Sequence, residues 1–399
     1  MKPARIPLLL SLSLLHALAP AAHAADPCND TCQALVREGH ALQAQGQFGP
    51  AYQKFKAASD ASPSASIPAS SAAALMLQLS AGAAPERADK LRASARDMAS
   101  QAARLAPDDP VAQEVLRELD DGPSAPLHAP SPQAARSRAQ AEVLFARQRY
   151  DEARAKYEEA MRADPAYSVA WVGAGDCYFM QKDLAGAEAM FRRATEIEPL
   201  NAQAWRFLSD ALLGQGKRAQ AEAALMTGIG ADPSQRPSWS KLAALRAGGT
   251  RPLVPLGLQR GARVLTGADG KLTVQIDERY SKVMDTPDGA VRLTLALQEA
   301  NLRKAAGDKT AGKPSSAYEI ELEAWRTALR VVDELKDKSG KALTDPALLR
   351  MQAMARDGHL EPAILILLFR QAYRPALDAW TAAHPGGVQA FIDRYAIRP

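Results

Sequence analysis

Few residues in this 399-residue chain have types and spacings that suggest chemistry. The sequence has no G-x-S-x-G elbow, no Walker-type phosphate-binding loop and no H-E-x-x-H zinc helix. Glu319 and Glu323 lie one helical turn apart and could pair for acid–base catalysis, although a solvated helix face is the favoured interpretation. His359 and His384 are isolated in sequence. We predict no catalytic residue, no metal site and no cofactor, and we favour a protein that is not an enzyme.

The three cysteines allow a disulfide at the start of the chain. Cys28 and Cys32 are four residues apart and could form a short clip in an oxidising compartment. A redox pair normally has two residues between its cysteines, so a redox site is disfavoured. Whether these two cysteines are bonded stays open. Cys177 is most simply a small buried residue.

A pattern with a period of 34 residues organises the middle of the chain. Tryptophans at 171, 205 and 239 share this spacing, as do alanines at 153, 187 and 221 and prolines at 165, 199 and 233. The clearest copy, residues 168–201, also carries Gly175, Tyr178, Phe191 and Ala194. These residues resemble the tetratricopeptide repeat (TPR) family over about residues 32–247. The resemblance implies stacked two-helix units.

The repeated residues have a structural explanation. Gly175 lies where the first helix of a unit must approach its partner closely, and Ala187 and Ala194 keep the second helix slim on the contact side. Phe191 follows Ala187 by four residues, on the same helical face. Pro199 ends the second helix. We therefore assign all these residues to the core.

The resemblance also implies a concave groove lined by the first helix of each unit. Its lining positions correspond here to Arg138, Glu142, Phe145, Val169, Val172, Asp176, Phe179, Met180, Gln203, Arg206, Asp210 and Leu213.

Two rows follow within that set. Glu142, Asp176 and Asp210 recur every 34 residues and would form an acidic row, beside an apolar row that includes Phe179 and Met180. Such a surface suits a protein or peptide partner with basic and hydrophobic side chains. The alternative is that the carboxylates only keep the groove soluble.

The first 24 residues predict a secretory signal peptide. Lys2 and Arg5 precede an apolar run at 8–18, and residues 22–24 offer a small-x-small cleavage pattern. The apolar run is too short for a convincing membrane span. We expect a mature chain that begins at Ala25, lacks a transmembrane segment and is located in a bacterial periplasm.

These patterns predict an all-α protein. Residues 25–119 read as N-terminal TPR-like helices, 120–133 as a Pro-rich linker, and 134–247 as TPR units that end in a capping helix at 238–247. Residues 258–399 match no family that we recognise and read as a mostly helical C-terminal domain.

Within the C-terminal domain, residues 263–277 alternate around a Gly-containing turn and predict a small β-hairpin. Residues 318–335 predict a strong amphipathic helix. Residues 291–306 favour a helix, with a strand as the alternative. Residues 363–369 form an apolar run that favours a buried helix over an exposed docking patch.

Charge gives modest limits on function. Lys plus Arg number 49 and Asp plus Glu 45, a net charge of +4 that does not require a nucleic-acid partner. We expect a periplasmic TPR scaffold or adaptor for envelope assembly or secretion. The alternative is that the C-terminal domain is an enzyme or a cell-wall glycan binder, with clustered Glu319, Glu323, His359 or His384, and that the repeats recruit its substrate. The partner, the pathway and the oligomeric state stay open.

Overall fold

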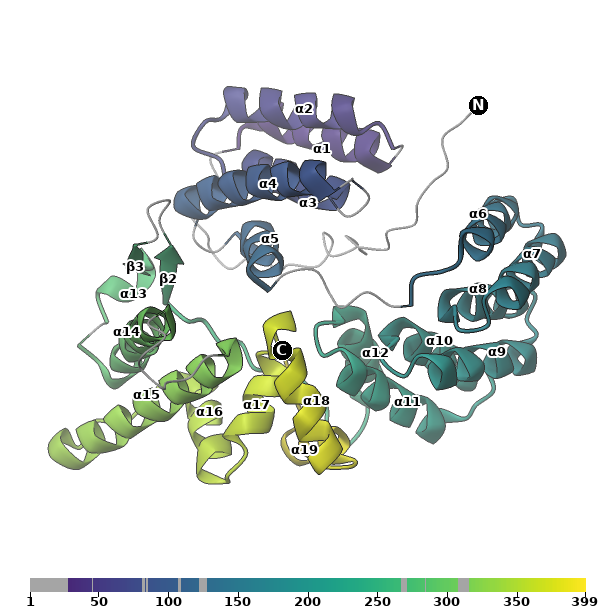
Figure 1. The fold of residues 1–399 in the computed structure, drawn as a ribbon. Coiled ribbons are helices and arrows are strands. Elements are labelled where there is room, and N and C mark those ends of the chain that lie inside the picture. Colours follow the sequence, from purple (N-terminus) through teal and green to yellow (C-terminus); the bar gives the residue numbers. More distant parts are fainter. Residues whose placement is uncertain are drawn as a thin grey trace. The chain divides into compact units, whose positions relative to one another are not determined.

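In a computed structural model, the chain divides into two compact units, residues 1–124 and 125–399 (Figure 1). The structure describes residues 28–44, 46–80, 83, 85–106, 109–121, 128–266, 271–283, 285–307 and 316–399. These residues are mostly helical, as the sequence predicts. The predicted signal peptide and residues 122–127 of the predicted linker lie outside them. In the described part, no helix is both long and apolar enough to cross a membrane.

The first unit is built from antiparallel helices. Cys28 and Cys32 form a disulfide at the start of the first helix. Phe55 and Leu75 are fully buried between the second and third helices. The described helices are α1 (Asp30–Ala44), α2 (Phe48–Ala61), α3 (Ile67–Ser80), α4 (Pro85–Leu105) and α5 (Pro110–Asp121).

The 34-residue period corresponds to three helical hairpins and one further helix. Each pair of helices packs antiparallel, and successive pairs stack side by side (Figure 1). The helices are α6 (Pro132–Ala146), α7 (Tyr150–Ala163), α8 (Ser168–Met180), α9 (Leu184–Ile197), α10 (Ala202–Gly214), α11 (Arg218–Ala231) and α12 (Arg236–Arg246).

The repeated tryptophans and prolines are linked to one another. The indole N–H of Trp205 donates to the carbonyl of Pro199 at 2.8 Å, and Trp239 donates to Pro233 at 2.8 Å. Each bond joins a first helix to the loop before it, where a backbone carbonyl would otherwise lack a helical partner. The repeated tryptophans and prolines are therefore explained by a hydrogen bond as well as by packing.

The repeated small residues allow close helix approach, as the sequence predicts. A Cβ atom at Gly175 would lie 2.5 Å from the Phe191 ring, and one at Gly173 would lie 2.3 Å from the Tyr157 ring. An aromatic ring of the second helix thus occupies the space above a glycine of the first helix. Ala187 and Ala194 are fully buried beside this contact.

The C-terminal part contains short strands and a helical bundle. The predicted hairpin is present, with Ala262 opposite Ile276 in an antiparallel pair, and its turn at 267–270 lies outside the described residues. Residues 287–307 form a helix, so the strand alternative for 291–306 is wrong. The elements are β1 (Val254–Pro255), β2 (Ala262–Thr266), β3 (Leu272–Ile276), α13 (Glu278–Ser281), α14 (Pro287–Gly307), α15 (Ala317–Ser339), α16 (Pro346–Arg356), α17 (Leu360–Leu367), a 3-10 turn η1 (Gln371–Tyr373), α18 (Arg374–Ala383), α19 (Gly387–Tyr395) and β4 (Ile397–Arg398).

The hydrophobic core of the C-terminal part continues into the repeats. Leu225 and Ile229 of α11 and Trp239 and Leu242 of α12 belong to the same buried cluster as the C-terminal helices. The chain end adds a parallel pair in which the Val254 N–H donates to the carbonyl of Ala396 at 2.9 Å. Helix α12 therefore does more than cap the array, because it joins the repeats to residues 253–399.

The apolar run at 363–369 lies inside this shared core. The exposed fraction of these side chains is small, 0% at Ile364 and Ile366 and 7% at Phe369. Buried Trp325 of α15 belongs to the same cluster. The structure thus agrees with burial of the run and contradicts an exposed docking patch.

Candidate functional site

The structure describes the side chains of every predicted groove residue, and most are accessible. They lie on α6, α8 and α10, which are the first helices of successive repeats. Met180 is 48% exposed, and Gln203 is also exposed. Val172 differs from the prediction because it is only 5% exposed and packs in the core with Leu208. The half-buried remainder comprises Arg138, Glu142, Phe145, Val169, Asp176, Phe179, Arg206, Asp210 and Leu213.

The two outer members of the acidic row are neutralised by basic side chains. Arg138 lies one helical turn from Glu142 and forms an ion pair of 3.4 Å with it. Lys241 of α12 forms an ion pair with Asp210. Both pairs are partly exposed, so each holds its carboxylate in place without adding much stability.

Asp176, the central carboxylate, lacks such a partner among the described residues. It forms no hydrogen bond or ion pair there, although it is only partly exposed. Burial raises the pKa of its carboxyl to about 7, and the negative charge of Glu142 adds to this effect. Arg206 and Asp210 act in opposite directions on it. The groove therefore holds a carboxylate whose charged form is poorly compensated.

Arg206 contributes positive charge that acts on Asp176. Burial lowers the pKa of Arg206, while the charges of Asp210 and Asp176 oppose that shift. Its guanidinium lies over the Phe207 ring, 4.9 Å from the ring centroid. Arg206 is therefore shared between two carboxylates and an aromatic face, and it leaves Asp176 without a direct contact.

Apolar side chains continue the surface beyond the charged row. Phe145 packs edge-on against Tyr150 with ring centroids 5.4 Å apart, and Phe179 and Leu213 adjoin the core of the next repeat. Met180 is the most exposed large apolar residue among the predicted groove residues. Methionine adapts its shape readily to different apolar partners.

The rival C-terminal residues are not gathered into one site. Glu323 pairs with Arg326 at 3.9 Å, and the Nδ1 atom of His359 lies 2.9 Å from the Tyr395 hydroxyl. His384 stacks on Trp380 with ring centroids 4.8 Å apart. Among the described residues, no group of three or more His, Cys, Asp or Glu side chains could hold a metal ion.

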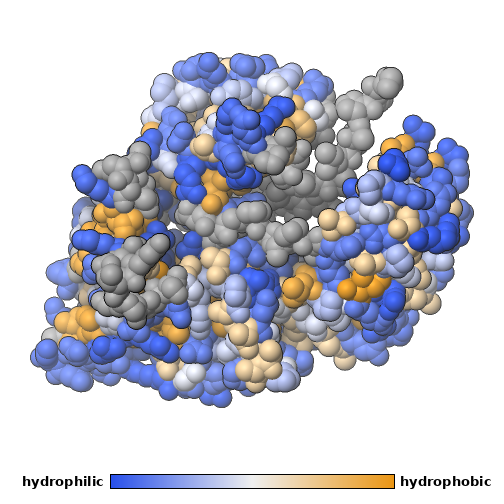
Figure 2. Space-filling model, in the orientation of Figure 1, coloured by the Kyte–Doolittle hydropathy of each residue, from blue (hydrophilic) through white to orange (hydrophobic). Residues whose placement is uncertain are grey.

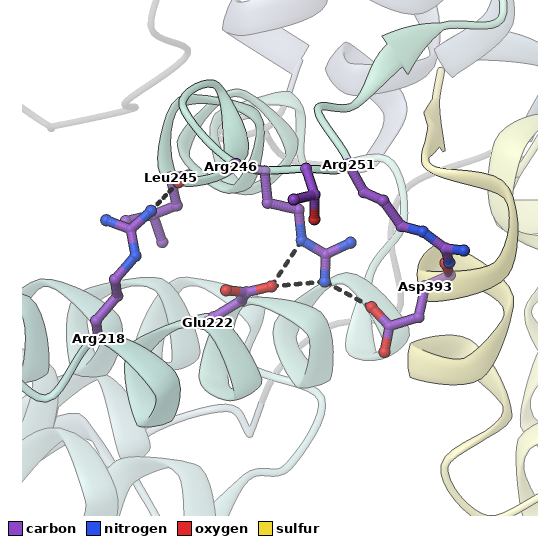
Figure 3. Close-up of a pocket in the computed structure, with 8 residues that line it drawn as sticks. Arg218, Glu222, Leu245, Arg246, Arg251 and Asp393 are labelled. Atoms are coloured by element: carbon purple, nitrogen blue, oxygen red, sulfur yellow. Dashed lines mark hydrogen bonds and ion pairs between the residues drawn. The ribbon is translucent and has the colours of Figure 1, made fainter.

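A hollow of about 450 Å³ lies where α11 and α12 meet α19 (Figure 3). Arg246 occupies its centre and donates to Glu222 and to Asp393, at 2.6 Å in each case. Arg251 donates to the backbone carbonyl of Asp393 at 2.7 Å. These contacts join the repeats to the C-terminal helices, and we assign them a structural role.

A second hollow, of about 340 Å³, lies among α15, α17 and α18. Its lining includes Tyr318, Glu319, Glu361 and Trp380. Sequence reasoning singled out Glu319 but missed the other three, because they come from three helices that only the fold brings together.

Sequence reasoning also missed Lys241 and Arg246. Lys241 lies outside the repeat positions that face the groove, and its partner Asp210 is on the preceding first helix. The basic residues of the predicted capping helix were a signal for Lys241, since its partner Asp210 belongs to the predicted acidic row.

The described surface has no single large apolar face in the orientation of Figure 2. Hydrophilic residues predominate there, and hydrophobic residues form small separate groups. The exposed large hydrophobic residues lie on elements as different as α6, α8 and α16, which carry Val143, Met180 and Leu349.

A family model described as "Tetratricopeptide repeat" matches residues 144–207 and 178–245. No curated protein matches the chain. Three solved structures are similar to parts of it. The first TPR of Spaghetti (RPAP3), bound to an HSP90 peptide, is 22% identical, covering 31% of this chain and 97% of that one with a TM-score of 0.28. The Sgt2 TPR domain from Aspergillus fumigatus is 22% identical, covering 32% and 83% with a TM-score of 0.29. YrrB, a TPR protein with an unusual peptide-binding site, is 15% identical, covering 52% and 89% with a TM-score of 0.26.

Proposed function

We propose that this protein, whose residues 144–245 are tetratricopeptide repeats, binds a segment of another protein in the groove of α6, α8 and α10. The segment carries a basic side chain that meets Asp176 and an apolar side chain that meets Phe179 and Met180. This activity is that of a scaffold or adaptor.

The observation that carries this proposal is the state of Asp176. Its carboxyl is enclosed enough for its pKa to rise to about 7, and it has no hydrogen-bond or ion-pair partner among the described residues. An uncompensated charge at such a site is costly. A guanidinium or ammonium group from a partner would offset that cost and would form a charge-assisted hydrogen bond.

Solubility alone explains the acidic row less well. Surface carboxylates that only solvate a helix point into water and keep ordinary pKa values. Glu142 and Asp210 have cationic partners, and Asp176 is held between them. The groove is therefore closer to a binding surface with one open position than to a solvated face.

Site-specific photo-crosslinking in cells that express the full chain tests the groove. A photoreactive amino acid at Gln203 or Met180 should give discrete crosslinked products, and Asp176→Asn should reduce their yield by about tenfold, the loss expected for one charge-assisted contact. The matched position outside the groove is Glu158, which lies on α7. Equal crosslinking from Glu158, or an unchanged yield with Asp176→Asn, would contradict the proposal.

We also propose a periplasmic location with a role in envelope assembly or secretion. The support is the signal-peptide pattern of residues 1–24, together with a disulfide between Cys28 and Cys32, which suits an oxidising compartment. Sequencing the N-terminus of the mature protein from a periplasmic fraction is the test. An intact Met1 in a cytosolic fraction would overturn this location.

A further inference from the structure

The geometry points to a second binding site, in the hollow among α15, α17 and α18, for an organic cation such as a guanidinium or ammonium group. The hollow has a volume of about 340 Å³ and lies far along the chain from the groove residues. Its lining combines two aromatic rings with two carboxylates. The inference does not depend on the function proposed for the groove.

The aromatic rings of this hollow are fixed by packing against other parts of the fold. One side of the Trp380 indole stacks on His384 at an interplanar angle of 21°, and a Cβ atom at Gly387 would come within 2.7 Å of the ring. The Tyr318 ring packs edge-on against buried Tyr373, with centroids 6.0 Å apart. Rings that are already ordered can bind a cation over their faces at a low entropic cost.

The ionisable groups that line the hollow are acidic. Glu319 is positioned by a capping box, in which its carboxylate accepts from the Ser316 N–H at 3.1 Å and from the Ser316 hydroxyl at 3.0 Å. Glu361 lies on α17 and pairs with Arg326 at 3.2 Å, in a partly exposed contact. The hollow therefore has a carboxylate on α15 and another on α17.

The charge of Glu361 acts on the Tyr318 hydroxyl, which lines the same hollow. Burial raises the pKa of this hydroxyl to about 12; the negative charge of Glu361 adds to that shift, and the positive charge of Arg326 opposes it. An aromatic ring and a carboxylate therefore line the same hollow.

An apolar floor completes the hollow and limits what it can hold. Leu365 and Ala376 belong to its lining. A ligand with a cationic head and a short apolar stem, such as an arginine side chain or a free alkylamine, would match both parts. An anion would face two carboxylates, and a neutral sugar would bring no positive charge to offset them.

The test uses the full mature chain labelled with 15N at tryptophan. Its spectrum should contain one indole resonance for each of the five tryptophans, and Trp380→Phe assigns the resonance of Trp380 by its loss. The probes are N-acetyl-arginine amide, its neutral isostere N-acetyl-citrulline amide, agmatine as a free alkyl cation, and an oligomer of N-acetylglucosamine.

Selective, saturable movement of the Trp380 resonance by a cationic probe is the expected result. Glu319→Gln and Glu361→Gln should each raise the dissociation constant by about tenfold, as expected for loss of one charge-assisted contact. Glu334→Gln, on the same helix but outside the hollow, is the matched control and should leave the constant unchanged. Binding of agmatine would identify a free cation as sufficient, whereas binding of the blocked arginine alone would identify a peptide side chain.

Three results would overturn the site. One is equal binding of the citrulline and arginine probes. Another is movement of Trp380 by the sugar oligomer alone, and the third is the absence of any movement of this resonance. Asp176→Asn should leave the Trp380 titration unchanged, so failure at this hollow and failure at the groove can be distinguished.

Discussion

At the scale of single residues, three acidic side chains at the same repeat position differ in whether a basic side chain neutralises them. Glu142, Asp176 and Asp210 occupy the same repeat position. Only Asp176 lacks a hydrogen-bond or ion-pair partner within the described residues. The difference arises because Arg138 lies one turn before Glu142 and Lys241 of α12 reaches Asp210, whereas Val172 lies one turn before Asp176.

Replacing Asp176 with Asn should make stability less dependent on pH. The folded-state pKa of Asp176 is raised to about 7, so the native state loses stability as pH rises from about 4 to 7, where the unfolded chain has already released its proton. Above pH 7, Asp176→Asn should increase the free energy of unfolding by roughly 1–2 kcal/mol, after allowance for solvent screening. Near pH 3.5 the two proteins should be similar.

Urea unfolding at pH 3.5, 6 and 8 measures this difference. Asp210→Asn is the matched control, because it removes a partly exposed ion pair and should cost up to about 1 kcal/mol at pH 8. A loss of stability in Asp176→Asn at pH 8 would show that its charge is already compensated in the folded chain.

At the scale of elements, the α8–α9 hairpin packs through an aromatic ring above a glycine, and α10 and α12 are each bonded through an indole to a proline carbonyl. Gly175 faces the Phe191 ring across the α8–α9 hairpin, and Trp205 is bonded to Pro199 at the start of α10. The indole bond recurs between Trp239 and Pro233, and small residues, Ala141 and Ser209, take the place of Gly175 in the neighbouring repeats, since each unit must bury the same face against its neighbour.

Adding one methyl group at Gly175 should destabilise the repeat. The new Cβ would lie 2.5 Å from the Phe191 ring, so the ring or the helix must shift, and we expect Gly175→Ala to lower the free energy of unfolding by about 1–3 kcal/mol. Gly49→Ala is the control, because nothing lies within 4 Å of the added atom and alanine favours a helix. Thermal unfolding monitored by circular dichroism would compare them, and similar melting temperatures for the two variants would count against close packing at Gly175.

The junction between α11, α12 and α19 should depend on Arg246. Its side chain is 12% exposed and bridges Glu222 and Asp393, so Arg246→Ala leaves two carboxylates without their shared partner. We expect a loss of about 1–3 kcal/mol in the free energy of unfolding. Arg218→Ala, in the same hollow but exposed, should change it by less than about 0.5 kcal/mol. If Arg246→Ala and Arg218→Ala lowered the free energy of unfolding equally in urea, the ion pairs of Arg246 would not stabilise the junction.

At the scale of the whole molecule, the boundary of a folding unit differs from the boundary of the repeat pattern. The sequence pattern changes near Gly249, which suggests a separate C-terminal domain. In the structure, Trp239 and Leu242 share one core with the C-terminal helices, and the unit extends over residues 125–399.

Truncation after Gly249 should therefore damage the repeats themselves. It would expose the buried faces of Leu225, Ile229, Trp239 and Leu242, and we expect a protein that aggregates or loses the cooperative unfolding of α11 and α12. A chain of residues 125–399 should instead remain monodisperse and unfold cooperatively. Size-exclusion chromatography and circular dichroism compare the two, and a well-behaved truncation at Gly249 would refute a shared core.

Local periodicity by itself determined the helical units, the buried role of Gly175 and Phe191, the β-hairpin and the burial of residues 363–369. These features follow from spacing along one element or between neighbouring elements. The tertiary structure alone decided that Val172 is buried, that Lys241 pairs with Asp210, and that Tyr318, Glu361 and Trp380 meet in one hollow. It also decided that α12 joins two regions rather than only ending one. The physical reason is that these contacts join elements far apart in the chain, and such pairings leave no period in a single sequence.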